Sequence, residues 1–123
     1  MSAVAVPTVD ADIDTALLEA FPGSSFVFQA TVDQIPTYWI SRSDSKEILA
    51  FLKNKYEMLF DLSAIDERMR THREGQPASD FTVIYHLMSL THGRDIRLKI
   101  ALAETDLNVA SIHQVYPNAN WYE

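Results

Sequence analysis

The clearest local pattern in this sequence is a predicted hairpin, FTVIYHLMSL (residues 81–90) and DIRLKIALA (residues 95–103), joined by THGR (residues 91–94). Apolar and polar side chains alternate along both segments, and this period of two is typical of a β-strand that buries one face. Within the connection, His92-Gly93 matches the short loops that join antiparallel strands. The stretch therefore predicts two antiparallel strands with a two-residue loop.

A two-residue loop fixes a register that sorts the hairpin side chains by face. The pairs on one face are Val83–Leu102, Tyr85–Ile100 and Leu87–Leu98, and those on the other are Ile84–Ala101, His86–Lys99 and Met88–Arg97. The first face is uniformly apolar and is expected to pack on helices. The second face is mixed, which suits either a wet protein interface or solvent. A slip by one residue would destroy this sorting, so the register is expected to be well specified.

Upstream of the hairpin, hydrophobic spacing predicts a helix, two strands, a second helix and a third strand. They are expected at residues 13–20, 26–32, 37–41, 44–56 and 58–64, before a polar loop or linker at residues 67–80. Asp44 is expected to cap the second helix, with Glu47 completing a capping box. One side of the third strand is expected to carry Met58, Phe60, Leu62 and Ala64.

This order of elements predicts an α+β domain of two layers. Two helices cannot cover both faces of a sheet of about five strands, so they are expected to pack on one face of a mixed sheet. The other face is then left for solvent or a partner. Residues 1–9 are expected to form a flexible tail, and residues 10–123 the domain.

Length and composition exclude several classes of protein. A chain of 123 residues fits one domain, since domains typically hold about 100–150 residues. A net charge of −7 argues against binding to nucleic acid or to an anionic membrane surface. The absence of cysteine excludes disulfides, iron–sulfur ligation and thiolate zinc sites by this chain. No membrane span and no signal peptide is predicted, which favours the cytoplasm.

The sequence offers few candidates for catalysis. The four histidines, His72, His86, His92 and His113, show no metal-ligand spacing. The carboxylates Asp61, Asp66 and Glu67 are better explained as a solvated rim than as an acid–base pair. Ser63 and Ser89 lack a nucleophile elbow, and three scattered glycines make no phosphate loop. We therefore predict no catalytic, cofactor-binding or metal-binding residue, with an autonomous enzyme that uses His86 or His113 as the alternative.

The end of the chain has a different character. Val115-Tyr116-Pro117-Asn118 is a turn that leads into the start of a helix, and Trp121-Tyr122-Glu123 carries neither a cap nor a basic last turn. This pattern indicates a domain truncated at its C-terminus. An aromatic plug at a natural end is the alternative.

Three blocks of the sequence resemble the 30-kDa subunit, also called the C subunit, of proton-pumping NADH:quinone oxidoreductase (respiratory complex I). The blocks are TYWISRSDSKEILAFLKNKYEMLFDLSAID (residues 37–66), FTVIYHLMSLTHGRDIRLKIAL (residues 81–102) and ASIHQVYPNANWYE (residues 110–123). The family signature continues past the tryptophan with an Arg-Glu step that this chain lacks. Some bacterial members are fused to the quinone-site subunit, called the D subunit, so the resemblance also implies that this chain could be part of a C–D fusion.

The resemblance implies a structural role. Family members bind no flavin, iron–sulfur cluster or quinone themselves; FMN, the clusters, NADH and quinone are used by the whole complex. They brace the D subunit and the cluster-bearing subunits of the peripheral arm, on the cytoplasmic side of the bacterial inner membrane. They contact the membrane only through the complex. Related scaffold subunits occur in membrane-bound hydrogenases, and this sequence alone does not separate the two complexes.

The predicted contact surface for other subunits combines the mixed hairpin face with the aromatic end of the chain. Its candidate residues are Ile84, His86, Met88, Arg97, Lys99, Tyr116, Trp121 and Tyr122.

Overall fold

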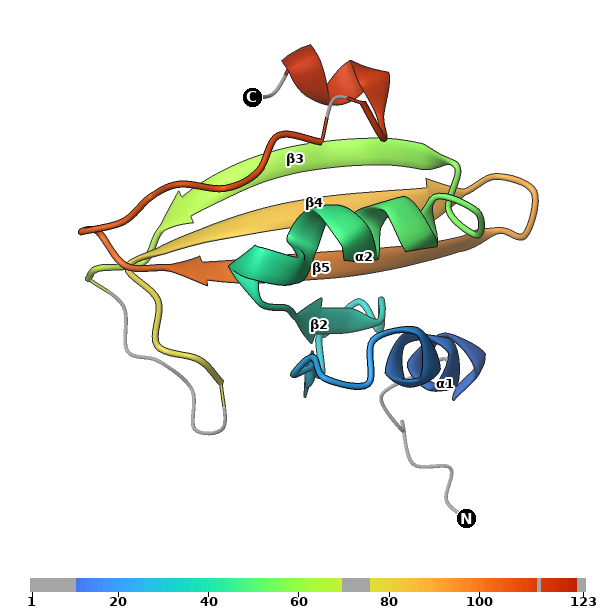
Figure 1. The fold of residues 1–123 in the computed structure, drawn as a ribbon, viewed down its shortest axis with the longest axis horizontal. Helices are drawn as coiled ribbons and strands as arrows, with labels where there is room; N and C mark the ends of the chain where they lie inside the picture. Colours follow the sequence, from blue (N-terminus) through green and yellow to red (C-terminus); the bar gives the residue numbers. More distant parts are fainter. Residues whose placement is uncertain (1–10, 70–75, 113, 122–123) are drawn as a thin grey trace.

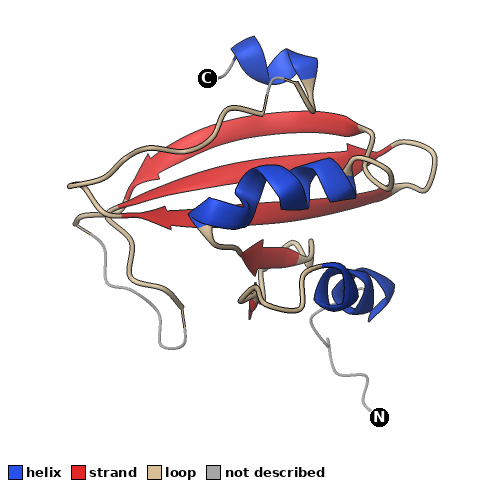
Figure 2. Cartoon of the chain, viewed as in Figure 1, coloured by secondary structure: helices blue, strands red, loops and turns tan. Residues whose placement is uncertain are grey.

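A computed structural model describes residues 11–69, 76–112 and 114–121 of the chain. Along the chain its elements are α1 (Ala11–Ala20), β1 (Val27–Gln29), β2 (Thr37–Trp39), the 3-10 helix η1 (Arg42–Asp44), α2 (Ser45–Leu52), β3 (Met58–Asp66), β4 (Phe81–Ser89), β5 (Arg94–Leu102) and the 3-10 helix η2 (Pro117–Trp121). Figure 2 distinguishes the helices from the strands. The predicted order of helices and strands is confirmed.

The strands form one mixed sheet in the order β1-β2-β5-β4-β3. β2 and β5 are parallel neighbours, whereas the other three pairs are antiparallel. α2 lies across the central strands, and α1 lies near β2 (Figure 1). The two-layer α+β architecture predicted from the sequence is therefore confirmed, and the helices at residues 11–20 and 45–52 leave the other sheet face open.

The core lies between α2 and the central strands. Ile48, Leu49 and Leu52 recur at helical spacing along α2 and are all fully buried. They belong to one apolar cluster whose members from the sheet are Tyr38, Leu59, Tyr85, Leu87, Ile96, Leu98, Ile100 and Leu102. Each fully buried aliphatic side chain contributes about 1.5–3 kcal/mol relative to exposure, so this cluster holds the two layers together.

The hairpin keeps its predicted faces but not its predicted partners. The observed pairs include Val83–Ile100 and Tyr85–Leu98, so the register prediction was wrong by two residues. A shift of two preserves the face of every side chain, because side chains alternate with a period of two. The strands end at the pair Ser89–Arg94, which leaves a four-residue loop in place of the expected two.

Interactions outside the two strands explain the longer loop. The Glu57 carboxylate accepts hydrogen bonds from the backbone N–H groups of Leu90 (2.8 Å) and Thr91 (3.2 Å). The Ser89 hydroxyl accepts the N–H of His92 at 3.1 Å. Gly93 has a φ of +63°, a conformation that glycine adopts without steric cost. These contacts fix the loop from a distant residue, which strand alternation alone does not reveal.

A β-bulge in β3 overturns the predicted grouping of its apolar residues. Leu59 is opposite Leu87 on the apolar face, but the register then shifts before Asp61, which is opposite His86. The extra residue, Phe60, is 52% exposed. Met58 and Phe60 therefore do not share a side with Leu62, because one inserted residue reverses the alternation of the strand.

The second helix also departs from its predicted ends. Asp44 is the N-cap of α2, but its side chain makes no capping hydrogen bond. Its carboxylate instead accepts the Ser24 hydroxyl at 2.8 Å, and η1 precedes the helix directly. α2 ends at Leu52, four residues before the predicted end at Tyr56.

Replacement of Leu98 by alanine tests the assignment of the core. Leu98 is fully buried on the central strand β5, so Leu98→Ala is expected to lower the free energy of unfolding by about 2–5 kcal/mol. Urea denaturation followed by circular dichroism would measure the change. The control Leu90→Ala removes a leucine that is 66% exposed and is expected to cost less than about 0.5 kcal/mol. Equal losses for both variants would contradict the assignment.

Candidate subunit interface

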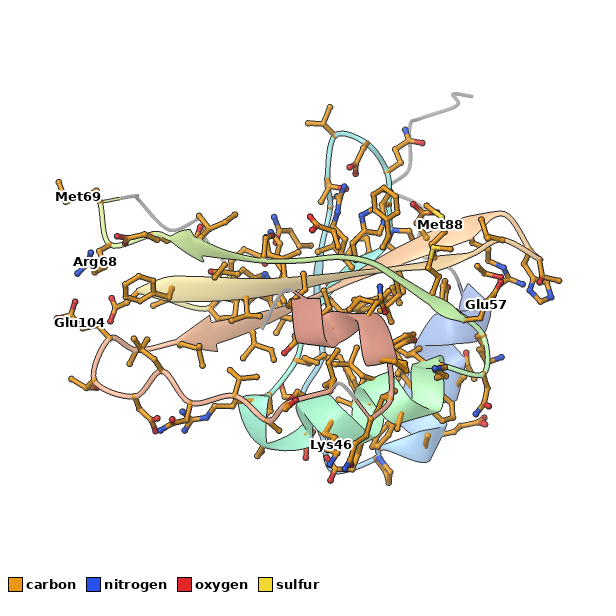
Figure 3. The ribbon with its side chains drawn as sticks, turned by 90° about the horizontal axis from the view of Figure 1, so that it is seen from above. Lys46, Glu57, Arg68, Met69, Met88 and Glu104 are labelled. Atoms are coloured by element: carbon orange, nitrogen blue, oxygen red, sulfur yellow. The ribbon has the colours of Figure 1, made fainter. Side chains whose placement is uncertain are left out.

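The sheet face opposite α2, here called the open face, collects five of the predicted interface residues. Strand register places Ile84, His86, Met88, Arg97 and Lys99 on this face, each partly buried. In Figure 3 the sheet is seen from its edge, with Met88 on one side and α2, η2 and Lys46 on the other. The predicted clustering of these five residues is confirmed, whereas their role as an interface stays a prediction.

A histidine–aspartate pair lies near the middle of the open face. Nε2 of His86 is 2.7 Å from Oδ2 of Asp95, and these side chains are 15% and 28% exposed. The Phe60 ring meets the imidazole edge to face, with ring centroids 5.1 Å apart. The bulge turns Phe60 outward and thereby places its ring against the imidazole of His86. The pair holds His86 in one orientation on the surface.

A second group on the open face is built around a glutamine. Oε1 of Gln29 accepts hydrogen bonds from Nε1 of Trp39 (2.9 Å) and from Nζ of Lys99 (3.1 Å). The Lys99 ammonium also lies 5.3 Å from the centroid of the Trp39 ring, a cation–π contact. Sequence reasoning missed Gln29 and Trp39 as site residues, because their shared partner Lys99 lies far along the chain.

Arg97 anchors the loop between β1 and β2. Its Nη2 lies 2.5 Å from Oδ2 of Asp33, and Oδ1 of Asp33 accepts the Thr31 hydroxyl at 2.6 Å. The hydrogen bond from Arg97, with that from Thr31, holds the pKa of Asp33 well below its usual range. In this loop Gln34 has a φ of +63°, and Val32 is fully exposed. Asp33 was not predicted as a site residue, since its partner lies far along the chain.

The aromatic end of the chain lies apart from the open face. Tyr116 is 1% exposed, and its hydroxyl donates a hydrogen bond to the carbonyl of Tyr56 at 2.6 Å. Tyr116 is therefore a core residue of this domain, which leaves little of its side chain for the predicted contact with another subunit. Burial raises the pKa of its phenol. The side chain of Trp121, and all of Tyr122 and His113, lie outside the described residues.

Neither of two surface grooves involves the histidine of the open face. One groove of about 460 Å³ includes Trp39, Arg42 and Asp106, and another of about 330 Å³ includes Leu62 and Val109. Among the residues that the structure describes, no three His, Cys, Asp or Glu side chains group as a metal site. In that same part of the chain, no helix has the length and apolar character to cross a membrane.

Comparison with known sequences finds a consistent set of relatives. A sequence profile described as "Respiratory-chain NADH dehydrogenase, 30 Kd subunit" matches residues 38–123. The C/D subunit of NADH-quinone oxidoreductase from Psychrobacter arcticus is 59% identical over 109 residues, which cover 86% of this chain and 18% of the relative. The C/D subunit from Acinetobacter baylyi is 55% identical over 104 residues, which cover 82% and 18%. The chain thus spans about a fifth of the length of these curated relatives.

Two solved structures share the fold at low sequence identity. A trypsin-resistant fragment (1-134) of Nqo5 is 20% identical with a TM-score of 0.67, covering 89% of this chain and 84% of the fragment. A chain of the membrane-bound sulfane sulfur reductase, an archaeal respiratory membrane complex, is 16% identical with a TM-score of 0.67, covering 91% and 62%. At these identities the likeness concerns the fold alone.

Removal of the Arg97 guanidinium tests the anchor of the β1–β2 loop. Arg97→Met is expected to raise the pKa of Asp33 toward the ordinary value of about 3.9, because the carboxylate loses its strongest donor. Because Asp33 has a lower pKa in the folded protein than in the unfolded protein, its ionised form stabilises the fold at pH values above the unfolded-state pKa. This stabilisation is lost as the pH falls through the folded-state pKa. Carbon NMR of the carboxyl groups during acid titration would measure the pKa of Asp33 in the unmodified protein and in Arg97→Met.

Arg42→Met provides the matched control for this titration. Arg42 pairs with Asp106 at 2.8 Å and lowers the pKa of that carboxyl instead. The control should therefore raise the pKa of Asp106 and leave Asp33 unchanged. An ordinary Asp33 titration in the unmodified protein would contradict the described anchor.

Proposed function

Because the chain belongs to the 30-kDa subunit family of respiratory-chain NADH dehydrogenase, we propose that it is a non-catalytic structural subunit of an NADH:quinone oxidoreductase. It works by binding neighbouring subunits of the peripheral arm rather than by chemistry of its own. The observation that carries this proposal is the open face, where five predicted interface residues lie together on the sheet. The complex carries electrons from NADH to quinone, with FMN and iron–sulfur clusters held by other subunits.

The open face has the character of a protein interface. Interfaces of this kind mix apolar and polar groups and contain bridging water. Here Ile84 and Met88 supply apolar area, while His86, Arg97 and Lys99 supply polar groups. Contacts within the domain already hold three of them: Asp95 holds His86, Asp33 holds Arg97 and Gln29 holds Lys99.

Prior ordering of the side chains favours binding. Immobilising a flexible side chain at an interface costs about 0.5–1.5 kcal/mol. The long side chains of Arg97 and Lys99 are already ordered in the unbound domain, because Asp33 and Gln29 hold them. Their ordering therefore adds little to the entropy lost on binding. A partner that meets the open face therefore loses less entropy on docking. The same contacts leave fewer charges unpaired when water is excluded.

We assign the partner to the D-subunit part of the C/D relatives and to adjoining cluster-bearing subunits. In the Psychrobacter relative, this domain corresponds to 18% of a longer polypeptide, so a large partner is covalently tethered to it. A tether raises the effective concentration of the partner to roughly the millimolar range. The complex then holds the domain on the cytoplasmic side of the inner membrane, and this acidic chain contacts no lipid itself.

Introduction of a charge on the open face tests the proposed function. The probe is the part of the Psychrobacter arcticus C/D polypeptide outside the matched region, produced separately and checked for folding by circular dichroism. The unmodified domain is expected to bind this probe, and Met88→Glu is expected to weaken binding about tenfold, because a carboxylate would be desolvated beside Asp95. Isothermal titration calorimetry would measure both affinities.

Ala50→Glu provides the matched control for added charge. Ala50 is exposed on α2, in the other layer of the domain, and the substitution also adds one carboxylate. Its affinity for the probe is expected to stay within about twofold of the unmodified domain. Failure of the unmodified domain to bind the folded probe would exclude the proposed function. Equal weakening by both variants would move the interface away from the open face.

A further inference from the structure

The apolar face of the sheet is incompletely covered near β3. α2 covers the central strands, and the segment after β5 returns along β3 to η2 (Figure 1). Between β3 and this returning segment lies the groove of about 330 Å³, here called the β3 groove. Its lining is mixed: the apolar residues Leu62, Ala64, Val83, Leu107, Val109 and Ala110 are joined by Tyr85, Ser63 and Ser111. The volume falls at the lower end of the range of about 300–1,000 Å³ for ligand-binding pockets.

Apolar side chains in the β3 groove keep contact with solvent although they face the core. Leu62, Val83 and Val109 are only partly buried and pack against the edge of the core cluster. Leu107, on the returning segment, is 51% exposed. Burial of this apolar area by a partner would be favourable in proportion to the area removed from water.

Beside the groove, β3 forms an edge of the sheet. Among the strands that the structure describes, β3 has a single neighbour, β4. At the start of the strand, the Asn118 side chain donates a hydrogen bond to the carbonyl of Leu59 at 2.8 Å, so that part is covered by η2. After the bulge, Asp61, Ser63 and Ala64 are exposed. An edge of this kind is a template for an added strand, whose alternate side chains can enter a neighbouring groove.

We propose that the β3 groove and the edge at residues 61–66 bind an extended segment of the polypeptide that accompanies this domain in the C/D relatives. The segment pairs its backbone with the strand edge and inserts an apolar side chain between Val83 and Leu107. This inference rests on the proposed function and adds a second contact, on the layer opposite the open face. The tether described above favours this source, since it keeps the segment close to the groove.

Charge disfavours a second copy of this chain as the occupant. Each copy carries a net charge of −7, so two domains that approach edge to edge repel each other. This repulsion favours a different segment as the occupant.

Substitutions in the groove and a matched exposed leucine test the inference. Leu107→Arg places a charge in the groove, and Ala110→Trp fills it from an exposed position on its rim. Both are expected to weaken binding of the same folded Psychrobacter probe about tenfold. Leu18→Arg, on α1, is the control, because Leu18 is also 51% exposed and lies outside the groove. Its affinity is expected to stay within about twofold of the unmodified domain.

Hydrogen exchange of the bound domain gives an independent readout. Backbone amides within residues 61–66 are expected to exchange more slowly in the complex with the unmodified domain, because a paired strand shields them from water. If the unmodified domain binds the probe but both groove variants bind equally well and these amides gain no protection, the inference is wrong and the proposed function stands. If the unmodified domain does not bind, both are wrong. If the domain self-associates and Leu107→Arg abolishes that association, the groove binds a second copy instead.

Discussion

The burial of one apolar face of the β4–β5 hairpin against α2 is the constraint on which the rest of this domain depends. Ile48, Leu49 and Leu52 pack against the sheet, and Leu87, Ile96 and Leu98 meet them from the central strands. Since β4 already occupies one side of β5, β2 pairs with the other side, and this β2–β5 pair is parallel whereas the other pairs of the sheet are antiparallel. The segment after β5 then closes the other side, since Ile112 and Tyr116 complete the core next to β3.

The open face follows from the same constraint. Side chains that alternate with a buried face must point the other way, and no helix among the described elements covers them there. Buried or partly buried polar groups need partners, and this sheet supplies them from neighbouring strands: Asp95 for His86, and Gln29 for Lys99. These contacts pair polar side chains of the face within the domain. They lower the cost of excluding water there, which is the property that the proposed docking role requires.

Much of the fold was predictable because its signals are local. Alternation in the hairpin and helical spacing in α2 each depend on neighbouring residues, so element order, fold class and the two hairpin faces were correctly predicted. The predictions fail where contacts between residues far apart in the sequence determine the local structure. Glu57 lengthens the hairpin loop and shifts the register by two, and Ser24 takes the Asp44 side chain from its expected cap. The bulge at Phe60 and the burial of Tyr116 likewise depend on packing between segments far apart in the sequence.

The two candidate surfaces differ in the way they gain binding energy. On the open face, hydrogen bonds within the domain already orient the side chains, so a partner gains specificity from matching fixed charges more than from area. In the β3 groove, apolar side chains and an unextended sheet edge remain to be covered, so a partner gains free energy from burial and backbone pairing. The surfaces lie on opposite layers, and a globular partner resting on one face reaches only one of them. A single partner that occupies both surfaces together needs an extended segment that passes around the edge at β3, which is the arrangement a covalently tethered partner can supply.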